Sequence, residues 1–131
     1  RYAQLAAEYN MLVANVFHAG DGNLHPCIFY DAGKPGELER SEELGGRMLE
    51  ICIEVGGTIT GEHGVGIEKL RQMCVQFRPN ELAMFHAIKK AFDPTGILNP
   101  GKGIPALKRC AEWGGMHVHD GSVPRADIPR F

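Results

Sequence analysis

The chain of 131 residues carries a formal net charge of −2 with its six histidines counted as neutral, and 44% of its residues are hydrophobic and 23% charged. This composition is ordinary for a soluble globular protein, and the length favours a single domain with a core of its own. The charge balance lacks the basic surplus that a nucleic-acid partner requires, and no apolar run approaches the ~18 residues of a membrane span.

The first part of the chain predicts a helix followed by strands. Residues 1–13 (RYAQLAAEYNMLV) are rich in alanine and leucine and resemble the end of a helix. Residues 14–30 are predicted as a strand region, because two glycines and an asparagine in their middle argue strongly against a helix. Residues 31–37 (DAGKPGE) have the composition of a loop.

Three further helices are predicted in the rest of the chain. Apolar residues recur at near-helical spacing over residues 38–55, and the Gly-Gly pair that follows is a natural C-cap. Residues 67–77 predict another helix, and residues 79–92 a last one, which a proline opens and an Asp-Pro pair stops. This order of elements predicts an α+β protein with few strands and at least three helices.

A glycine-rich break between two histidines raises the first question about function. In NVFHAGDGNLHPCIFY, residues 15–30, His18 and His25 are seven positions apart. In one regular strand, an odd spacing would place the two imidazoles on opposite faces of the sheet. A glycine bulge or a tight turn between them restores them to a common side. The sequence therefore predicts two strands with an irregular break, across which the two histidines converge.

The segment GEHG, residues 61–64, adds a carboxylate to this pair. Two neutral imidazoles and one carboxylate suit a catalytic zinc or a similar divalent ion with an open position, and Glu62 is the natural third ligand. The adjacent His63 is expected to point elsewhere, because neighbours in an extended segment face opposite ways. Histidines beside turns also serve as surface or capping groups, so both interpretations remain open on spacing alone.

The remaining histidines and glycines predict less. His86 lies inside the last predicted helix and is interpreted as an exposed or partly buried helix residue. His117 and His119 share a strand face and could bind a metal, although a solvent-exposed tail is the favoured interpretation. The glycines of GEHGVG follow the order GxxGxG, not GxGxxG, and no Lys-Ser/Thr follows, which argues against a nucleotide-binding loop.

Three motifs together resemble one enzyme family. HAGDGNLHP, GGTITGEHGVG and FDPTGILNPGKG look like the C-terminal part of FAD-linked oxidases of the vanillyl-alcohol-oxidase type. That family includes D-lactate, D-2-hydroxyglutarate and glycolate dehydrogenases. The tail CAEWGGMHVHDGSVPRADIPRF is similar to the end of the flavin subunit of bacterial glycolate oxidases.

The resemblance implies a fold and an organisation. Residues 1–131 would be a single-domain fragment, the C-terminal part of a ferredoxin-like α+β substrate domain with antiparallel strands and at least three helices. The FAD-binding domain would be absent from these residues. We therefore expect this chain alone to bind no FAD and to be inactive, and we expect it to expose an unpaired sheet edge.

The resemblance also implies roles for individual residues. The implied metal ligands are His18, His25 and Glu62. His63 matches the catalytic base of the family. Asn99, in LNPGK, matches an asparagine near the flavin, and Asn23 is expected to contact the substrate.

The implied activity is the oxidation of a 2-hydroxy acid, glycolate to glyoxylate, with hydride transfer to FAD. A divalent metal such as Zn is implied as a second cofactor. The implied partners are other oxidase subunits, including an iron–sulfur subunit, and the expected location is the cytoplasm, peripheral to the inner membrane through those subunits. Two alternatives stay open: a D-lactate or D-2-hydroxyglutarate dehydrogenase of the same family, and a non-catalytic assembly module clipped by the metal.

Overall fold

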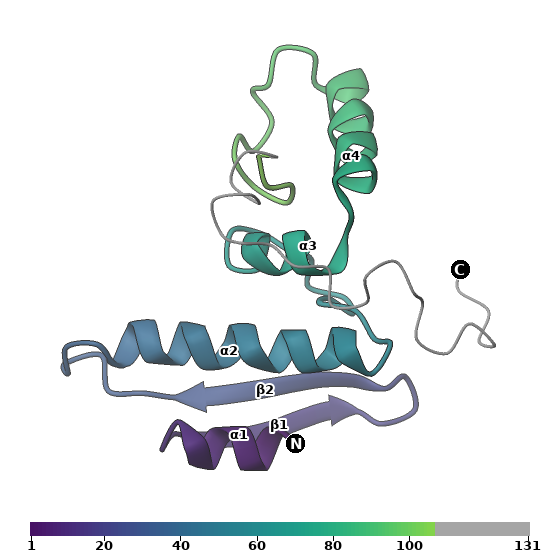
Figure 1. Ribbon diagram of the computed structural model, residues 1–131. Helices are drawn as coiled ribbons and strands as arrows, with labels where there is room; N and C mark the ends of the chain where they lie inside the picture. Colours follow the sequence, from purple (N-terminus) through teal and green to yellow (C-terminus); the bar gives the residue numbers. More distant parts are fainter. Residues whose placement is uncertain (107–131) are drawn as a thin grey trace. The chain divides into compact units, whose positions relative to one another are not determined.

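The computed structural model describes residues 1–106, in which four helices accompany a two-stranded antiparallel sheet (Figure 1). The predicted α+β class, with antiparallel strands and at least three helices, is confirmed. The chain divides into two units, which are described separately below. Unit 1 is Arg1–Ile51, and unit 2 begins at Cys52.

Unit 1 begins with helix α1, Tyr2–Glu8. After the C-cap residue Tyr9, the chain leaves the helix at Asn10, whose φ of 50° lies in the left-handed region that asparagine tolerates better than most residues. The Met11 N–H then bonds to the Ala6 carbonyl and the Asn10 N–H to the Ala7 carbonyl, which satisfies carbonyls at the helix end. The helix is therefore shorter than the predicted segment 1–13, whose last two residues already belong to a strand.

Strands β1, Leu12–His18, and β2, Asn23–Phe29, form an antiparallel hairpin. Their register runs without interruption from Leu12 opposite Phe29 to His18 opposite Asn23. The connection is a tight turn that carries Gly22 at a φ of 67°. Of the two irregular backbones predicted between the histidines, the turn is therefore the one present, and the register contains no bulge.

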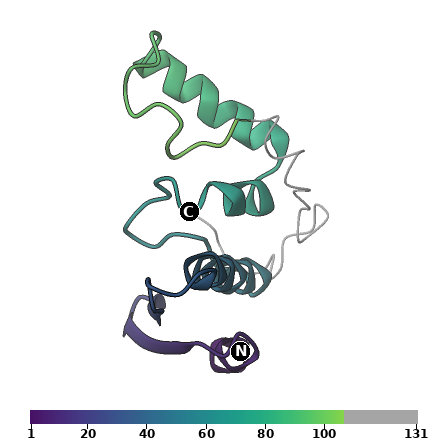
Figure 2. The ribbon, with the colours of Figure 1, turned by 90° about the vertical axis from the view of Figure 1, so that its left-hand side faces the viewer.

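One face of the hairpin packs against helix α2, Glu37–Glu54, which runs alongside it (Figures 1 and 2). Val13 and Ile28 are cross-strand partners, so their side chains point to this same face. The buried cluster consists of Leu5, Met11, Leu44 and Met48, with Tyr2, Tyr9, Val13, Ile28 and Ile51 packed against it. Full burial of one such aliphatic side chain contributes about 1.5–3 kcal/mol, so this cluster stabilises unit 1 by several such contributions.

Helix α2 ends at the predicted Gly-Gly pair. Gly56 adopts a φ of 86°, and the N–H of Gly57 bonds to the carbonyl of Cys52 at 2.8 Å. This is the left-handed cap that glycine forms without a steric penalty.

Unit 2 contains helices α3, Leu70–Gln76, and α4, Pro79–Phe92. The predicted proline start and Asp-Pro stop of α4 are both confirmed. The apolar residues buried in this unit include Ile59, Leu70, Met73, Cys74 and Leu82. Phe77, at the C-terminal end of α3, and Phe85, in the middle of α4, form an edge-to-face pair with ring centroids 5.0 Å apart. Within the described residues, no helix has the length and apolar character required to cross a membrane.

Candidate active site

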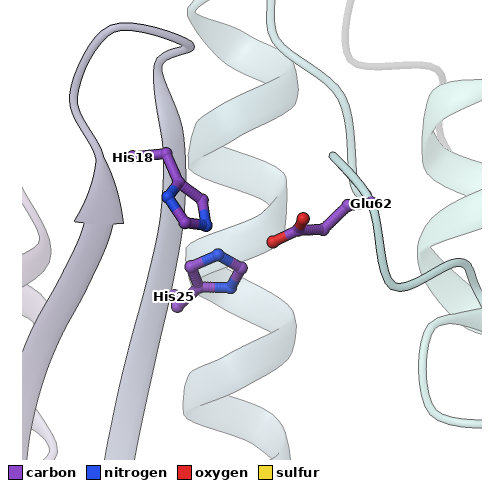
Figure 3. Close-up of side chains that lie close together, drawn as sticks. All are labelled: His18, His25 and Glu62. Atoms are coloured by element: carbon purple, nitrogen blue, oxygen red, sulfur yellow. The ribbon is translucent and has the colours of Figure 1, made fainter.

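The two histidines of unit 1 meet on one face of the hairpin. His18 lies opposite Asn23, and side chains alternate along a strand, so His25 points to the same side as both. The two imidazole rings stand edge to face with centroids 5.1 Å apart (Figure 3). The histidines therefore converge, as the sequence predicted, because the tight turn reverses the chain between them.

This pair of rings fits the needs of a divalent ion. One nitrogen of His18 lies within 4.8 Å of one nitrogen of His25. Zinc binds imidazole nitrogens at ~2.0–2.1 Å, so two nitrogens on one tetrahedral ion stand about 3.4 Å apart. His18 is exposed and His25 is only partly buried.

In unit 2, the segment that carries the predicted carboxylate is held at both ends. Before it, Ile59 is 2% exposed, and its N–H donates to Oε1 of Gln76 on α3 at 2.9 Å. After it, the N–H of Gly103 donates to the carbonyl of Gly66 at 2.8 Å. Between these anchors, residues 61–64 are exposed to solvent and residue 65 is partly exposed.

Glu62 and His63 occupy the middle of this loop. The distance from Nε2 of His63 to Oε1 of Glu62 is 3.5 Å, and the side chains are 72% and 47% exposed respectively. The prediction that His63 would point away from Glu62 is wrong, because the chain bends here and is not an extended strand. Glu62 belongs to unit 2 and the two histidines to unit 1, and Figure 3 labels all three side chains.

Asn99 lies in the loop that follows α4. It is exposed, and its φ of 45° places it in the left-handed region, where asparagine is several times commoner than most other residues. The N–H of Lys102 donates to its carbonyl at 3.2 Å, which closes the turn after it. An exposed carboxamide both donates and accepts hydrogen bonds, so it suits the carbonyl and N–H groups of a flavin ring.

Residues 1–103 match the family model described as FAD linked oxidases, C-terminal domain. The chain belongs to this family. It is 61% identical over 129 residues to the glycolate oxidase subunit GlcD of Escherichia coli K12, an alignment that covers 98% of this chain and 26% of that relative. It is 45% identical over 98 residues to GlcD of Bacillus subtilis, covering 75% of this chain and 21% of that protein.

A more distant relative carries another substrate in its name. The mitochondrial D-lactate dehydrogenase [cytochrome] of Arabidopsis thaliana is 38% identical over 96 residues, which cover 73% of this chain and 17% of that protein. This FAD-linked oxidase chain spans about a quarter or less of the length of these curated relatives.

Of the three remaining histidines, His86 is the one within the described residues. In this FAD-linked oxidase domain, His86 is partly buried on α4, and its Nε2 lies 2.9 Å from the carbonyl oxygen of Pro105. This contact agrees with the interpretation of His86 as a helix residue that packs. His117 and His119 lie outside the described residues.

One buried aspartate with a lysine partner was not predicted from the sequence. Asp93 is 6% exposed although it ends a surface helix, and its side chain accepts a hydrogen bond from Lys89 at 2.7 Å. The bond from Lys89, together with bonds from the N–H groups of Leu98 and Ile97, lowers the pKa of the Asp93 carboxyl below its usual value. A signal was present: an aspartate before Pro-Thr-Gly, with a lysine four residues earlier on the helix.

Proposed function

We propose that this chain is the C-terminal, substrate-domain part of an FAD-dependent 2-hydroxy-acid dehydrogenase that oxidises glycolate to glyoxylate. The observation that carries the proposal is the 61% identity to a glycolate oxidase subunit over 98% of the chain. Identity to the relatives named D-lactate dehydrogenase is 37–40%. Glycolate is therefore favoured over D-lactate as the substrate.

We place a divalent ion such as zinc at His18, His25 and Glu62. Two imidazoles and one carboxylate are a common donor set for a catalytic ion that keeps one position open. The convergence of the two rings on one hairpin face supports this assignment. When bound, the ion would supply Lewis-acid chemistry, which lowers the pKa of a bound hydroxyl. Asn23, the cross-strand neighbour of His18, would contact the substrate beside it.

His63 is the proposed general base. Oxidation of glycolate removes a proton from the hydroxyl oxygen and a hydride from the carbon that carries it. The exposed imidazole of His63 can reach a substrate and accept the proton, and the Glu62 carboxylate beside it can balance the positive charge that then develops on the ring. A carboxylate has two oxygens, so one can face His63 while the other serves as a metal ligand.

FAD, when bound, would supply the two-electron acceptor for the hydride. Asn99 is the residue of this chain that we assign to the flavin, because its exposed carboxamide can hydrogen bond to a flavin ring. The relatives from Escherichia coli and Bacillus subtilis are both named as subunits of an oxidase. We therefore propose that further oxidase subunits, an iron–sulfur subunit among them, take the electrons onward at the cytoplasmic side of the inner membrane.

The test is substrate-driven flavin reduction, followed by stopped-flow absorbance in the intact flavoprotein that contains this domain. His63→Asn should slow reduction by glycolate ~10²–10⁴-fold, the usual contribution of a general base, while the FAD content stays unchanged. His86→Asn is the matched control, since His86 packs on α4, and it should reduce at the normal rate.

Near-normal reduction in His63→Asn would remove His63 from the role of base. Faster reduction by D-lactate than by glycolate in the unsubstituted protein would instead select the alternative substrate. D-2-hydroxyglutarate is the third acid to be compared. If none of the three acids reduces the flavin, the non-catalytic assembly module becomes the better account of the domain.

A further inference from the structure

The loop that carries Asn99 is not held in place by burial of its own apolar residues. Ile97 is 75% exposed and Leu98 is 56% exposed, although both are large aliphatic residues. Hydrophobic contacts usually fix such a segment, because buried aliphatic side chains release water. Within the described residues, polar bonds must therefore supply the order of this loop.

The Asp93 carboxylate makes three of these bonds. Its Oδ1 accepts the N–H of Ile97 at 3.0 Å, and its Oδ2 accepts the N–H of Leu98 at 3.0 Å. Oδ2 also accepts a bond from Nζ of Lys89 at 2.7 Å. The Asp93 side chain is 3% exposed, so water competes little for these bonds. Hydrogen bonds to a charged acceptor are stronger than hydrogen bonds between neutral groups, so the single Asp93 carboxylate can order both Ile97 and Leu98.

Lys89 fixes the other side of the same segment. Its Nζ donates to the carbonyl oxygen of Leu98 at 2.7 Å in addition to its bond with Asp93. That carbonyl lies in the same peptide plane as the nitrogen of Asn99. The two charged side chains thus set the orientation of the peptide that leads into Asn99, which then adopts its left-handed φ of 45°.

The ordered loop is also tied to the loop of His63. Beyond Asn99, the chain turns through the bond from Lys102 N–H to the Asn99 carbonyl, and Gly103 then donates to Gly66. Gly66 lies three residues after His63 in the sequence. All of these residues belong to unit 2, so one continuous set of bonds connects Asp93 to both proposed functional loops.

We propose that Asp93 and Lys89 are positioning residues for hydride transfer, which hold Asn99 in the orientation that contacts the flavin. This inference rests on the proposed function. It makes Asp93 and Lys89 act through Asn99 without touching substrate or cofactor themselves. Their removal should therefore change the rate of flavin reduction more than the amount of FAD that is bound.

The experiment compares Asp93→Asn, Lys89→Met and the control Lys90→Met in the intact flavoprotein. Lys90 is the exposed neighbour of Lys89, so Lys90→Met removes the same charge without removing the bonds to Asp93 and Leu98. Asp93→Asn and Lys89→Met should slow glycolate-driven reduction about 10- to 100-fold, the range that follows from a small misplacement of a contacting group. Lys89→Arg should retain more of the rate than Lys89→Met, and Lys90→Met should retain all of it.

Two further readouts separate positioning from a general loss of structure. In an Asn99→Ala background, Asp93→Asn should cost less than about twofold, because residues that act through one another are not additive. Hydrogen exchange at the amides of Ile97 and Leu98 should accelerate at least about tenfold in Asp93→Asn and stay unchanged in Lys90→Met. If Asp93→Asn fails to fold, the same two measurements on Lys89→Met test the proposal. The side chain of Lys89 is 30% exposed, so its replacement should disturb folding less than a change at the buried Asp93.

A folded Asp93→Asn protein that reduces at the normal rate would overturn the proposal, as would full additivity with Asn99→Ala. A failure of the proposed function has a different signature. In that case the unsubstituted protein would show no reduction by a 2-hydroxy acid, which would reject the catalytic role of Asp93 and Lys89 together with the function itself.

Discussion

Replacement of Gly22 by alanine should destabilise the protein, whereas the same replacement at Gly20 should not. Both glycines lie in the turn between the two histidines, and a Cβ added to either would meet nothing within 4 Å. They differ in backbone conformation, because only Gly22 has a φ, 67°, in the left-handed region. A difference in stability between Gly22→Ala and Gly20→Ala therefore reports backbone strain and not a steric clash of the added methyl group.

The magnitude follows from two opposing effects. A non-glycine residue in the left-handed region costs roughly 1–2 kcal/mol, whereas alanine in place of glycine regains roughly 0.4–1 kcal/mol by restricting the unfolded chain. Gly22→Ala should therefore lower the free energy of unfolding by about 1 kcal/mol. Gly20→Ala carries only the favourable effect and should raise that free energy by up to about 1 kcal/mol.

Urea unfolding followed by circular dichroism measures the change in unfolding free energy for both variants. The slope of that free energy against urea concentration should stay the same, which checks that the unfolded state is unaltered. A difference of about 1 kcal/mol corresponds to roughly 4 °C in melting temperature for a domain of this size. Equal stability of the two variants would refute the reasoning, because the turn would then not require a left-handed residue at position 22.

Three other predictions concern the proposed ion, a buried carboxylate and the core. His25→Ala should weaken zinc binding in calorimetry by at least about 10- to 100-fold, since loss of a ligand should cost no less than loss of a residue that merely orients one. His86→Ala should leave zinc binding unchanged. Because the pKa of Asp93 is lowered in the folded protein, its stabilising effect is present above its pKa in the unfolded chain and is lost as the pH falls through the folded value. Asp93→Asn should therefore weaken the dependence of the unfolding free energy on pH below about pH 4. An unchanged pH dependence would contradict the lowered pKa. Leu44→Ala, at a fully buried position in unit 1, should cost about 2–5 kcal/mol on urea unfolding, whereas Val16→Ala, at a position that is 58% exposed, should cost well under half of that.

Much of the secondary structure could be predicted because its signals are local. A proline opens α4 and an Asp-Pro pair ends it, and the Gly-Gly pair ends α2, each through the backbone angles of the residue itself. The start of β1 was predicted less well. Leu12 and Val13 continue a run that is also compatible with a helix, and the left-handed Asn10 that ends α1 has only a weak sequence signal.

The periodicity of α4 predicted a helix correctly but did not predict which side is buried. Leu82, Ile88 and Phe92 are apolar residues at near-helical spacing in this segment. Leu82 is 1% exposed, whereas Ile88 and Phe92 are 55% and 84% exposed within the described part of the chain. Periodicity reports the helix, whereas burial depends on which elements pack against it.

The residue types of the candidate site were determined by the sequence alone: imidazoles and a carboxylate beside glycines, and an asparagine in a Pro-Gly loop. The directions of their side chains were decided by the tertiary structure. A hairpin turn brings His18 and His25 to one face, and a bent loop places His63 beside Glu62. The bond between Gly103 and Gly66 links segments that are far apart in the chain. No local pattern encodes such a bond, because each partner is an ordinary peptide group that acquires its direction only when the chain has folded.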